Sequence, residues 1–201
     1  MKALLIIGVA VAFVVTLLLG YAFLVAKPNL PKISALTDYK PKTPLRVYTA
    51  DKVLIGEFGE ERRKVIPLGE IPLSMRNAVL AIEDDRFYSH GGVDYVGILR
   101  AAATNLRGHL SQGASTITMQ VARNFFLSNE KTFSRKIYEV LLAWEIESQL
   151  TKDKILEIYM NQIFLGQRAF GFSSAAQIYF GKELKDITIA ESAMLAGLPK
   201  A

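Results

Sequence analysis

Hydrophobic positions are distributed unevenly along this chain, and the longest apolar run comes first. Residues 3–26 contain no charged side chain. As a helix this run would rise about 36 Å, at roughly 1.5 Å per residue, which exceeds the roughly 30 Å hydrocarbon core of a bilayer. A cleaved signal peptide is the alternative, but its apolar region normally has only about 7 to 15 residues. The pattern predicts a membrane-spanning helix over 3–26, within an anchor segment of residues 1–26.

The segment that follows has a different character. Residues 27–44 contain four prolines, and we expect a linker without helix or strand because proline lacks an amide hydrogen and blocks regular hydrogen bonding. Residues 45–58 then form two β-favouring runs around Ala50–Lys52, which predicts a small β-hairpin. An irregular extended arm is the alternative. Residues 27–64 are therefore interpreted as a juxtamembrane linker with a hairpin.

From residue 67 onward, apolar residues recur mostly every three or four positions, as in amphipathic helices. The expected helices lie at 72–82, 94–106, 116–127, 132–150, 151–163 and 173–180, and a further one follows a capping box at 188–191. The expected N-caps are Ser115, Thr132 or Ser134, and Thr151. No alternation typical of a parallel sheet and no internal repeat occurs. We predict a mainly α domain over 65–201.

Composition and charge limit the chemistry. The chain has no cysteine, which excludes disulfides and Cys-ligated metals, and its two histidines make a His-rich metal site a poor interpretation. The formal net charge is +5, with 24 Lys and Arg residues. This mild excess fits anionic lipid head groups or a diphosphate substrate. No Arg-rich arm or RNA-binding signature is present, so we expect no nucleic-acid partner.

The first candidate for catalysis is the stretch 83–92, which places acids, aromatic residues, a histidine and two glycines directly after an apolar helix. Glu83 occupies the point where this helix meets the loop. A carboxylate that is partly desolvated in such a place suits a general base. The alternative interpretation is a solvated acidic helix end.

Three further stretches combine polar groups in suggestive ways. Residues 112–120 are a Gly-containing turn that enters a helix, where free backbone N–H groups can bind an anion, although an ordinary N-cap has the same pattern. Residues 135–139 place two cations three and four positions before Glu139, which is also typical of a surface ion pair. Residues 154–161 are the third such stretch, and their pattern is also typical of a plain amphipathic helix.

Together these stretches resemble, in order and spacing, the motifs of the peptidoglycan glycosyltransferases (glycosyltransferase family 51), the lysozyme-like membrane domain of bifunctional class A penicillin-binding proteins. The matching stretches are EDDRFYSHGGVD, QGASTITMQVARN, RKIYEVLLAWEIE, KDKILEIYMNQIFLGQRAFG and ESAMLAGLPKA. The resemblance covers about residues 65–201 and is strongest to the 1A subgroup. Met119 stands where that family usually has Gln, and we expect altered packing there rather than lost activity.

The resemblance implies an activity and a location. The activity is polymerisation of lipid II, the undecaprenyl-diphosphate-linked disaccharide pentapeptide, into β-1,4 glycan strands for the cell wall. The location is the cytoplasmic membrane, with a single-pass anchor and the catalytic domain on the outer, periplasmic face. We also expect this glycosyltransferase domain to be incomplete at its C-terminal end, and the full-length protein to carry a DD-transpeptidase domain. We expect that domain to lie outside this stretch.

The resemblance also assigns roles to residues. Glu83 is the expected catalytic base, and Glu139 matches the family's second essential acid. The cations expected at the diphosphate are Arg123, Lys131, Arg135 and Lys136. Residues expected to shape the cleft or contact substrate are Asp84, Phe87, Ser115, Thr116 and Gln120. We expect no metal-ligating residue and no required cofactor, with Mg²⁺ or Mn²⁺ at most assisting at the diphosphate.

The expected partners are lipid II, the growing glycan strand and membrane lipid, with cell-wall synthesis proteins and a second copy of the chain as further candidates. Two alternative functions remain. One is a membrane-anchored lytic glycosidase or transglycosylase of lysozyme-like fold, against which the density of Lys and Arg argues. The other is a non-catalytic cell-wall scaffold, against which the presence of both glutamates and the cations argues.

Overall fold

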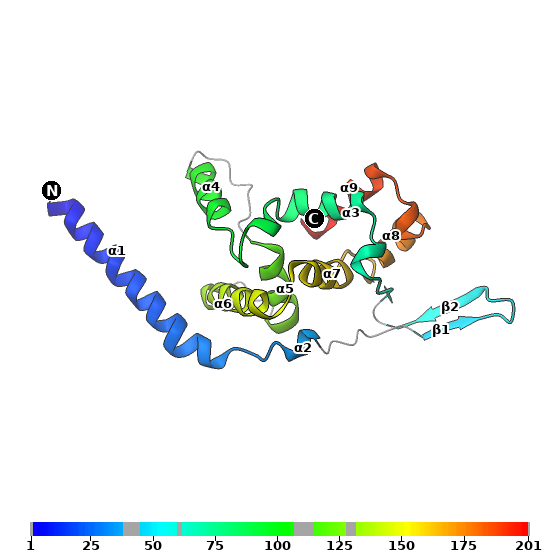
Figure 1. Cartoon of the computed structure of the whole chain (residues 1–201), viewed down its shortest axis with the longest axis horizontal. Helices are drawn as coiled ribbons and strands as arrows, with labels where there is room; N and C mark the ends of the chain where they lie inside the picture. The colour runs from blue at the N-terminus through cyan, green and yellow to red at the C-terminus, as the bar shows by residue number, and fades with distance from the viewer. Residues whose placement is uncertain (1, 38–44, 60–61, 107–114, 128–131, 201) are drawn as a thin grey trace.

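The computed structural model describes residues 2–37, 45–59, 62–106, 115–127 and 132–200, and these residues are mostly helical, as the periodicity predicts (Figure 1). The principal helices of the globular part are α3 (Leu73–Glu83), α4 (Tyr95–Leu106), α5 (Ile117–Phe126), α6 (Phe133–Gln149), α7 (Lys152–Gln162), α8 (Phe172–Phe180) and α9 (Ile189–Gly197). Short helical turns lie between them at η3 (Leu68–Glu70), η4 (Phe87–Ser89), η5 (Leu184–Asp186) and η6 (Leu198–Lys200).

Most helix ends follow the local sequence signals. Thr132 and Thr151 cap α6 and α7, since each hydroxyl accepts the backbone N–H three residues on. Thr188 and Glu191 form the predicted capping box at α9. Gly181 ends α8 in the left-handed conformation, with φ of 66°.

The N-cap of α5 differs from the prediction. Thr116, and not Ser115, caps this helix, because the Thr116 hydroxyl accepts the backbone N–H of Met119 at 3.2 Å. The Ser115 hydroxyl instead accepts a hydrogen bond from Lys136, 21 residues away in sequence. Which of the two adjacent hydroxyl residues caps α5 therefore depends on a contact with a residue far away in the sequence.

The apolar N-terminal run is helical, as expected. It consists of α1 (Lys2–Gly20), the π-helical turn η1 (Tyr21–Ala26) and the 3₁₀ turn η2 (Lys27–Asn29), and the N-terminal end of α1 points away from the globular body in Figure 1. Within the described residues, the stretch Gly8–Asn29 is the one helical segment long and apolar enough to cross a membrane. The η1 turn packs against α6.

The prediction that residues 27–44 lack helix is wrong in two places. Besides η2, the short helix α2 (Ser34–Thr37) follows Pro31. Pro28 falls in the first turn of η2, where a missing amide hydrogen costs nothing. Ile33 and Leu36 are buried in the main core, so this part of the linker is tied to the globular domain. Pro41 and Pro44 lie outside the described residues.

Strands are few among the described residues. β1 (Leu45–Tyr48) and β2 (Leu54–Phe58) pair antiparallel, with an irregularity between Val47 and Tyr48, which confirms the predicted hairpin. A second, minimal pair joins β3 (Arg62–Arg63) in parallel with β4 (Ala169–Phe170). No alternating pattern predicted this second pair, because two residues per strand are too few to produce one.

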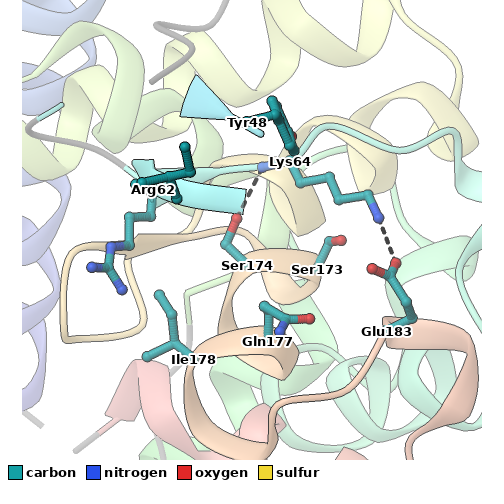
Figure 2. Close-up of a pocket in the computed structure, with 10 residues that line it drawn as sticks. Tyr48, Arg62, Lys64, Ser173, Ser174, Gln177, Ile178 and Glu183 are labelled. Atoms are coloured by element: carbon teal, nitrogen blue, oxygen red, sulfur yellow. Dashed lines mark hydrogen bonds and ion pairs between the residues drawn. The ribbon is translucent and has the colours of Figure 1, made fainter. Parts of the chain in front are cut away.

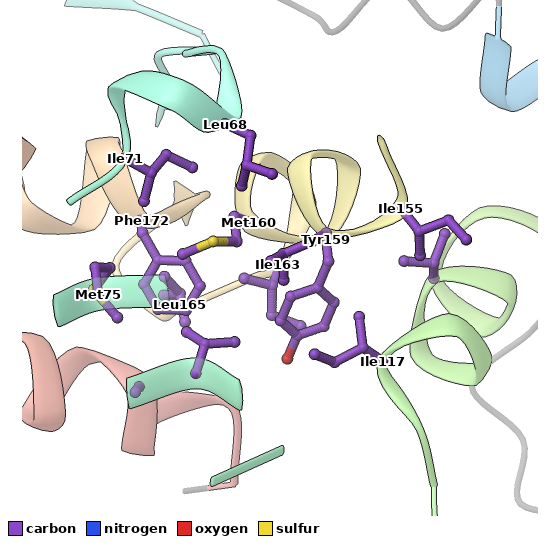
Figure 3. Packing of buried hydrophobic residues seen from close by; sticks show 14 of the residues in the cluster. Leu68, Ile71, Met75, Ile117, Ile155, Tyr159, Met160, Ile163, Leu165 and Phe172 are labelled. Carbon is purple, nitrogen blue, oxygen red and sulfur yellow. The ribbon is translucent and has the colours of Figure 1, made fainter. Parts of the chain in front are cut away.

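The main core is built around α5 and α7. α5 packs against both α6 and α7, and α3 packs against α9 (Figure 1). Figure 3 shows side chains of α3, α7 and α8 meeting in this core. The largest fully buried side chains include Met75, Phe87, Ile117, Leu142, Ile146, Ile155, Tyr159, Met160 and Phe172. This packing brings the end of α3, the start of α5 and the middle of α6 toward one another.

Two apolar faces stay outside this core. On α4, Tyr95 and Leu99 are 60% and 71% exposed. On α6, Phe133 and Trp144 are also exposed, at 75% and 41%, and they turn toward the N-terminal helix. Helical periodicity predicts an apolar face on each of these helices, but it does not indicate whether that face packs in the core or points outward.

Candidate active site

Glu83 is the last residue of α3 and is partly buried. Its Oε2 atom accepts a hydrogen bond from Nε2 of Gln120 at 2.7 Å. Its Oε1 atom is buried and has no hydrogen-bond partner among the described residues. A buried carboxylate oxygen without a donor is uncommon in folded proteins. The carboxylate therefore has one oxygen held by Gln120 and one oxygen without a donor from the described residues.

Asp84 faces the protein interior and is 7% exposed. Its carboxylate oxygens lie 3.0 and 3.1 Å from Nε2 of His90, and Oδ2 also accepts the backbone N–H of Ile117 at 3.0 Å. This one carboxylate thus joins the loop after α3 to the first residue of α5. The predicted role in shaping the site fits these contacts, which use both oxygens within the protein.

Phe87 is 1% exposed and belongs to the main core. Its ring packs edge-on against Tyr88, and the ammonium group of Lys152 lies 4.3 Å from the ring centroid. The structure therefore places Phe87 beneath the loop that follows Glu83, where it supports that loop.

The segment that enters α5 connects two groups of charged residues. Gln120, which is 6% exposed, binds Glu83 as described above. Ser115 accepts a hydrogen bond from the ammonium group of Lys136 at 2.9 Å. Between them, the Thr116 hydroxyl donates to the carbonyl of Gly92 at 2.6 Å. Six consecutive residues, 115–120, thus contact both the Glu83 region and α6.

Glu139 is the second acid predicted from the sequence, and its side chain is only 1% exposed. Its Oε2 accepts a hydrogen bond from Lys136 Nζ at 2.9 Å, and its Oε1 lies 3.2 Å from Nε of Arg135. The surface ion-pair interpretation of this stretch is wrong because the shared carboxylate is buried. A buried carboxylate that binds two cations fixes the positions of both.

The two remaining predicted cations are less well defined. Arg123 lies in the last turn of α5, is partly buried, and forms no ion pair with another described residue. Its positive charge acts to lower the pKa of Tyr159, so the two side chains lie near each other. Lys131 lies outside the described residues.

Tyr159 was not among the predicted site residues. Its hydroxyl donates to Oε1 of Gln120 at 3.4 Å, near the outer limit for a hydrogen bond, and the side chain is 1% exposed. Burial raises the pKa of Tyr159, and the negative charge of Glu83 raises it further. The stretch 154–161 contained this residue, but helical spacing alone marks it as an ordinary core position.

Met119 packs in a small cluster with Val93 and Ala143, apart from the main core, and is 1% exposed. Its side chain therefore packs inside the protein against apolar neighbours.

An apolar groove runs between the N-terminal helix and α6. It has a volume of 380 Å³ and is lined by side chains from both, including Leu19, Phe23, Ile137 and Trp144. Lys136 also lines it. The groove therefore reaches the cation that contacts Ser115 and Glu139.

A pocket of 680 Å³ lies elsewhere, between the β1–β2 hairpin and α8 (Figure 2). Lys64 forms an ion pair with Glu183 there, and its backbone N–H donates to the Ser174 hydroxyl at 2.9 Å. None of the site residues predicted from the sequence lines this pocket. Its size alone does not make it the candidate site.

Comparison with known proteins gives a consistent family assignment. A family model described as Transglycosylase matches residues 51–201. Penicillin-binding protein 1A of Neisseria gonorrhoeae is 59% identical over 185 residues, which cover 92% of this chain and 23% of that protein. The protein of the same name from Pseudomonas aeruginosa is 55% identical over 181 residues, which cover 90% of this chain and 22% of that protein.

Among solved structures, the 2.6 Å crystal structure of penicillin-binding protein 1A from Haemophilus influenzae matches with a TM-score of 0.38 and 29% identity. The match covers 81% of this chain and 15% of that chain. The present chain thus spans less than a quarter of the length of the relatives it matches.

Proposed function

This chain belongs to the transglycosylase family, and on that premise we propose that it is a peptidoglycan glycosyltransferase that polymerises lipid II into β-1,4-linked glycan strands. The identity of 55–59% to penicillin-binding proteins 1A supports a role in cell-wall synthesis. The observation that carries the residue assignment is the position of the segment 115–120, which contacts Glu83 at one end and Lys136 at the other.

The reaction is an inverting displacement at the anomeric carbon of the donor. Glu83 takes the proton from the 4-hydroxyl group of the acceptor sugar. The acceptor oxygen forms a bond to the donor C1 atom, while the bond from C1 to the diphosphate oxygen breaks. Undecaprenyl diphosphate leaves with the electron pair. A carboxylate with one oxygen held by Gln120 and one oxygen without a donor is suited to accept this proton.

The chemistry of the leaving group explains why the proposed site contains several cations. A diphosphate is a weak base, so its departure needs positive charge near its oxygens more than it needs a proton. Lys136 contacts Glu139 and Ser115 through its ammonium group, and its side chain is 44% exposed. Arg135, Arg123 and Lys131 complete the proposed cationic region. The proposed role of Glu139 is to orient Arg135 and Lys136.

A divalent cation has a secondary place in this mechanism. Among the described residues no group of three or more His, Cys, Asp or Glu side chains is arranged to hold a metal ion. An assisting Mg²⁺ or Mn²⁺ would bind the oxygens of the substrate diphosphate and add positive charge there.

The substrate defines the proposed location. Lipid II carries a long polyprenyl chain, so its sugar head group is presented at a membrane surface. The apolar segment Gly8–Asn29 would anchor the enzyme there as a single-pass protein, with the catalytic domain on the outer, periplasmic face. Its partners would be lipid II, the growing glycan strand and membrane lipid.

The test is an assay of the natural full-length protein in detergent with lipid II and, separately, with finished glycan. We expect polymer to form from lipid II and finished glycan to remain intact. Cleavage of the glycan without consumption of lipid II would instead support the lytic alternative. Binding of lipid II without any turnover would support the scaffold.

A further inference from the structure

Tyr159 carries a hydroxyl group into the core where α7 packs against α5. Figure 3 shows its ring between Ile163 and Ile117, with the oxygen atom at the far end. The acceptor for this hydroxyl is Oε1 of Gln120 at 3.4 Å. Gln120 in turn donates from Nε2 to Oε2 of Glu83 at 2.7 Å. Three side chains from three helices thus form one chain of hydrogen bonds.

The direction of this chain follows from the chemistry of its members. Burial raises the pKa of Tyr159 far above its ordinary value, with a further rise from the charge of Glu83 that the nearby Arg123 opposes. The hydroxyl is therefore protonated at neutral pH and can donate. The amide oxygen of Gln120 accepts, so the amide nitrogen must point to the other side, toward Glu83.

We propose that Tyr159 is a positioning residue for the catalytic base, which fixes the orientation of the Gln120 amide so that its nitrogen faces Glu83. This inference rests on the proposed function, because it assumes that Glu83 is the base. Tyr159 acts through Gln120 and touches no reacting atom.

The orientation of the Gln120 amide determines which oxygen of Glu83 is held by a hydrogen bond. A reversed Gln120 amide would place its carbonyl oxygen against Oε2 of Glu83, and two acceptors would face each other without a proton between them. A reversed amide would also leave the buried Tyr159 O–H without its acceptor, so the hydroxyl disfavours that arrangement. With Oε2 held by Gln120, the buried Oε1 is the atom left to receive the acceptor's proton.

The test is Tyr159→Phe in the natural full-length protein, assayed with lipid II. The ring and its packing remain, and one hydrogen bond is lost, so kcat should fall about tenfold while KM for lipid II changes little. Tyr179→Phe is the matched control, because the Tyr179 hydroxyl donates to the carbonyl of Leu165 at 2.7 Å, away from Glu83. It should lose comparable thermal stability and keep normal kcat.

A double-mutant cycle separates positioning from structure. Gln120→Ala should lower kcat at least as much as Tyr159→Phe, and the double variant should lose no more than Gln120→Ala alone. Additive losses would mean that Tyr159 acts independently of Gln120 and would overturn the proposal. Normal kcat in either single variant would overturn it as well.

Glu83→Gln, measured in parallel, distinguishes a failure of the proposed function from a failure of the role proposed for Tyr159. If Glu83→Gln polymerises lipid II normally, the proposed base is wrong and the positioning role falls with it. If Glu83→Gln is inactive and Tyr159→Phe is normal, the proposed function stands and only the role of Tyr159 is rejected.

Discussion

Lys136 and Glu139 lie one turn apart on α6, with Nζ and Oε2 separated by 2.9 Å, although the Glu139 side chain is 1% exposed and the Lys136 side chain is 44% exposed. An ordinary surface pair would have both partners in water. Here the buried acid holds the ammonium group of the lysine, whose side chain as a whole is partly exposed. That arrangement suits a cation that binds an anionic substrate.

Lys136→Ala should therefore lower polymerisation of lipid II by about 100- to 1000-fold, the usual cost of removing one group that stabilises developing negative charge. The fold should persist, because Arg135 remains 3.2 Å from Glu139. Lys154→Ala is a matched control, since Lys154 forms a similar pair with Glu157 at 2.7 Å on α7. Turnover and thermal unfolding of both variants are the measurements. Normal turnover of Lys136→Ala would show that Lys136 does not bind the donor.

Glu83→Gln keeps the size of the side chain but replaces the carboxylate that is proposed to take the acceptor's proton. The rate should fall by about two to four orders of magnitude, and binding of a donor-site inhibitor should survive. Glu145→Gln, on α6, changes charge in the same way at a side chain whose Oε1 accepts from Gln149 at 2.7 Å, and it should be nearly silent. A Glu83→Gln enzyme with near-normal polymerisation would refute the mechanism.

Gly92→Ala should destabilise the loop after α3. Gly92 has φ of 85°, and an added Cβ would meet the carbonyl oxygen of Ala143 at 2.9 Å. Strain of this kind costs about 1 to 3 kcal/mol. Because Thr116 donates to the Gly92 carbonyl, polymerisation should fall too. The adjacent Gly91→Ala meets nothing within 4 Å and should leave the melting temperature unchanged; equal melting temperatures for the two variants would contradict the strain argument.

Deletion of residues 1–26 should release the protein from membranes only in part. The apolar face of α4 remains exposed at Tyr95 and Leu99, and such a face can insert into the interfacial region of a bilayer. Sedimentation with vesicles measures the bound fraction. Changing Tyr95 and Leu99 to Ser in the shortened protein should lower the bound fraction further, with the remainder held by the α6 face at Phe133 and Trp144. Full solubility of the shortened protein itself would show that α4 makes no membrane contact.

The sequence predicted those parts of the fold that depend on neighbouring residues. The caps at Thr151 and Thr188 and the end at Gly181 follow rules that act within one helical turn, and each was predicted correctly. The hairpin at 45–58 was likewise confirmed. Glu83 was correctly placed at the end of its helix for the same reason.

Features that depend on distant contacts were missed. Ser115 has the right chemistry for an N-cap, but its hydroxyl contacts Lys136 on another helix. Spacing showed that Glu139 could pair with Lys136, yet the burial of its carboxylate depends on how α6 packs in the fold. Tyr159 reads as a core residue, and its contact with Gln120 requires two helices to be placed side by side. Local patterns contain none of this information.

The start of α5 also has a mechanical consequence. Its hydrogen bonds reach Glu83 through Gln120, the loop through Asp84, and α6 through Ser115, all within one short rigid segment. The proposed proton acceptor and the proposed substrate-binding cation Lys136 are therefore both hydrogen-bonded to the same segment. A substitution that shifts this helix should therefore disturb both the proposed activation of the nucleophile at Glu83 and the proposed stabilisation of the leaving group at Lys136.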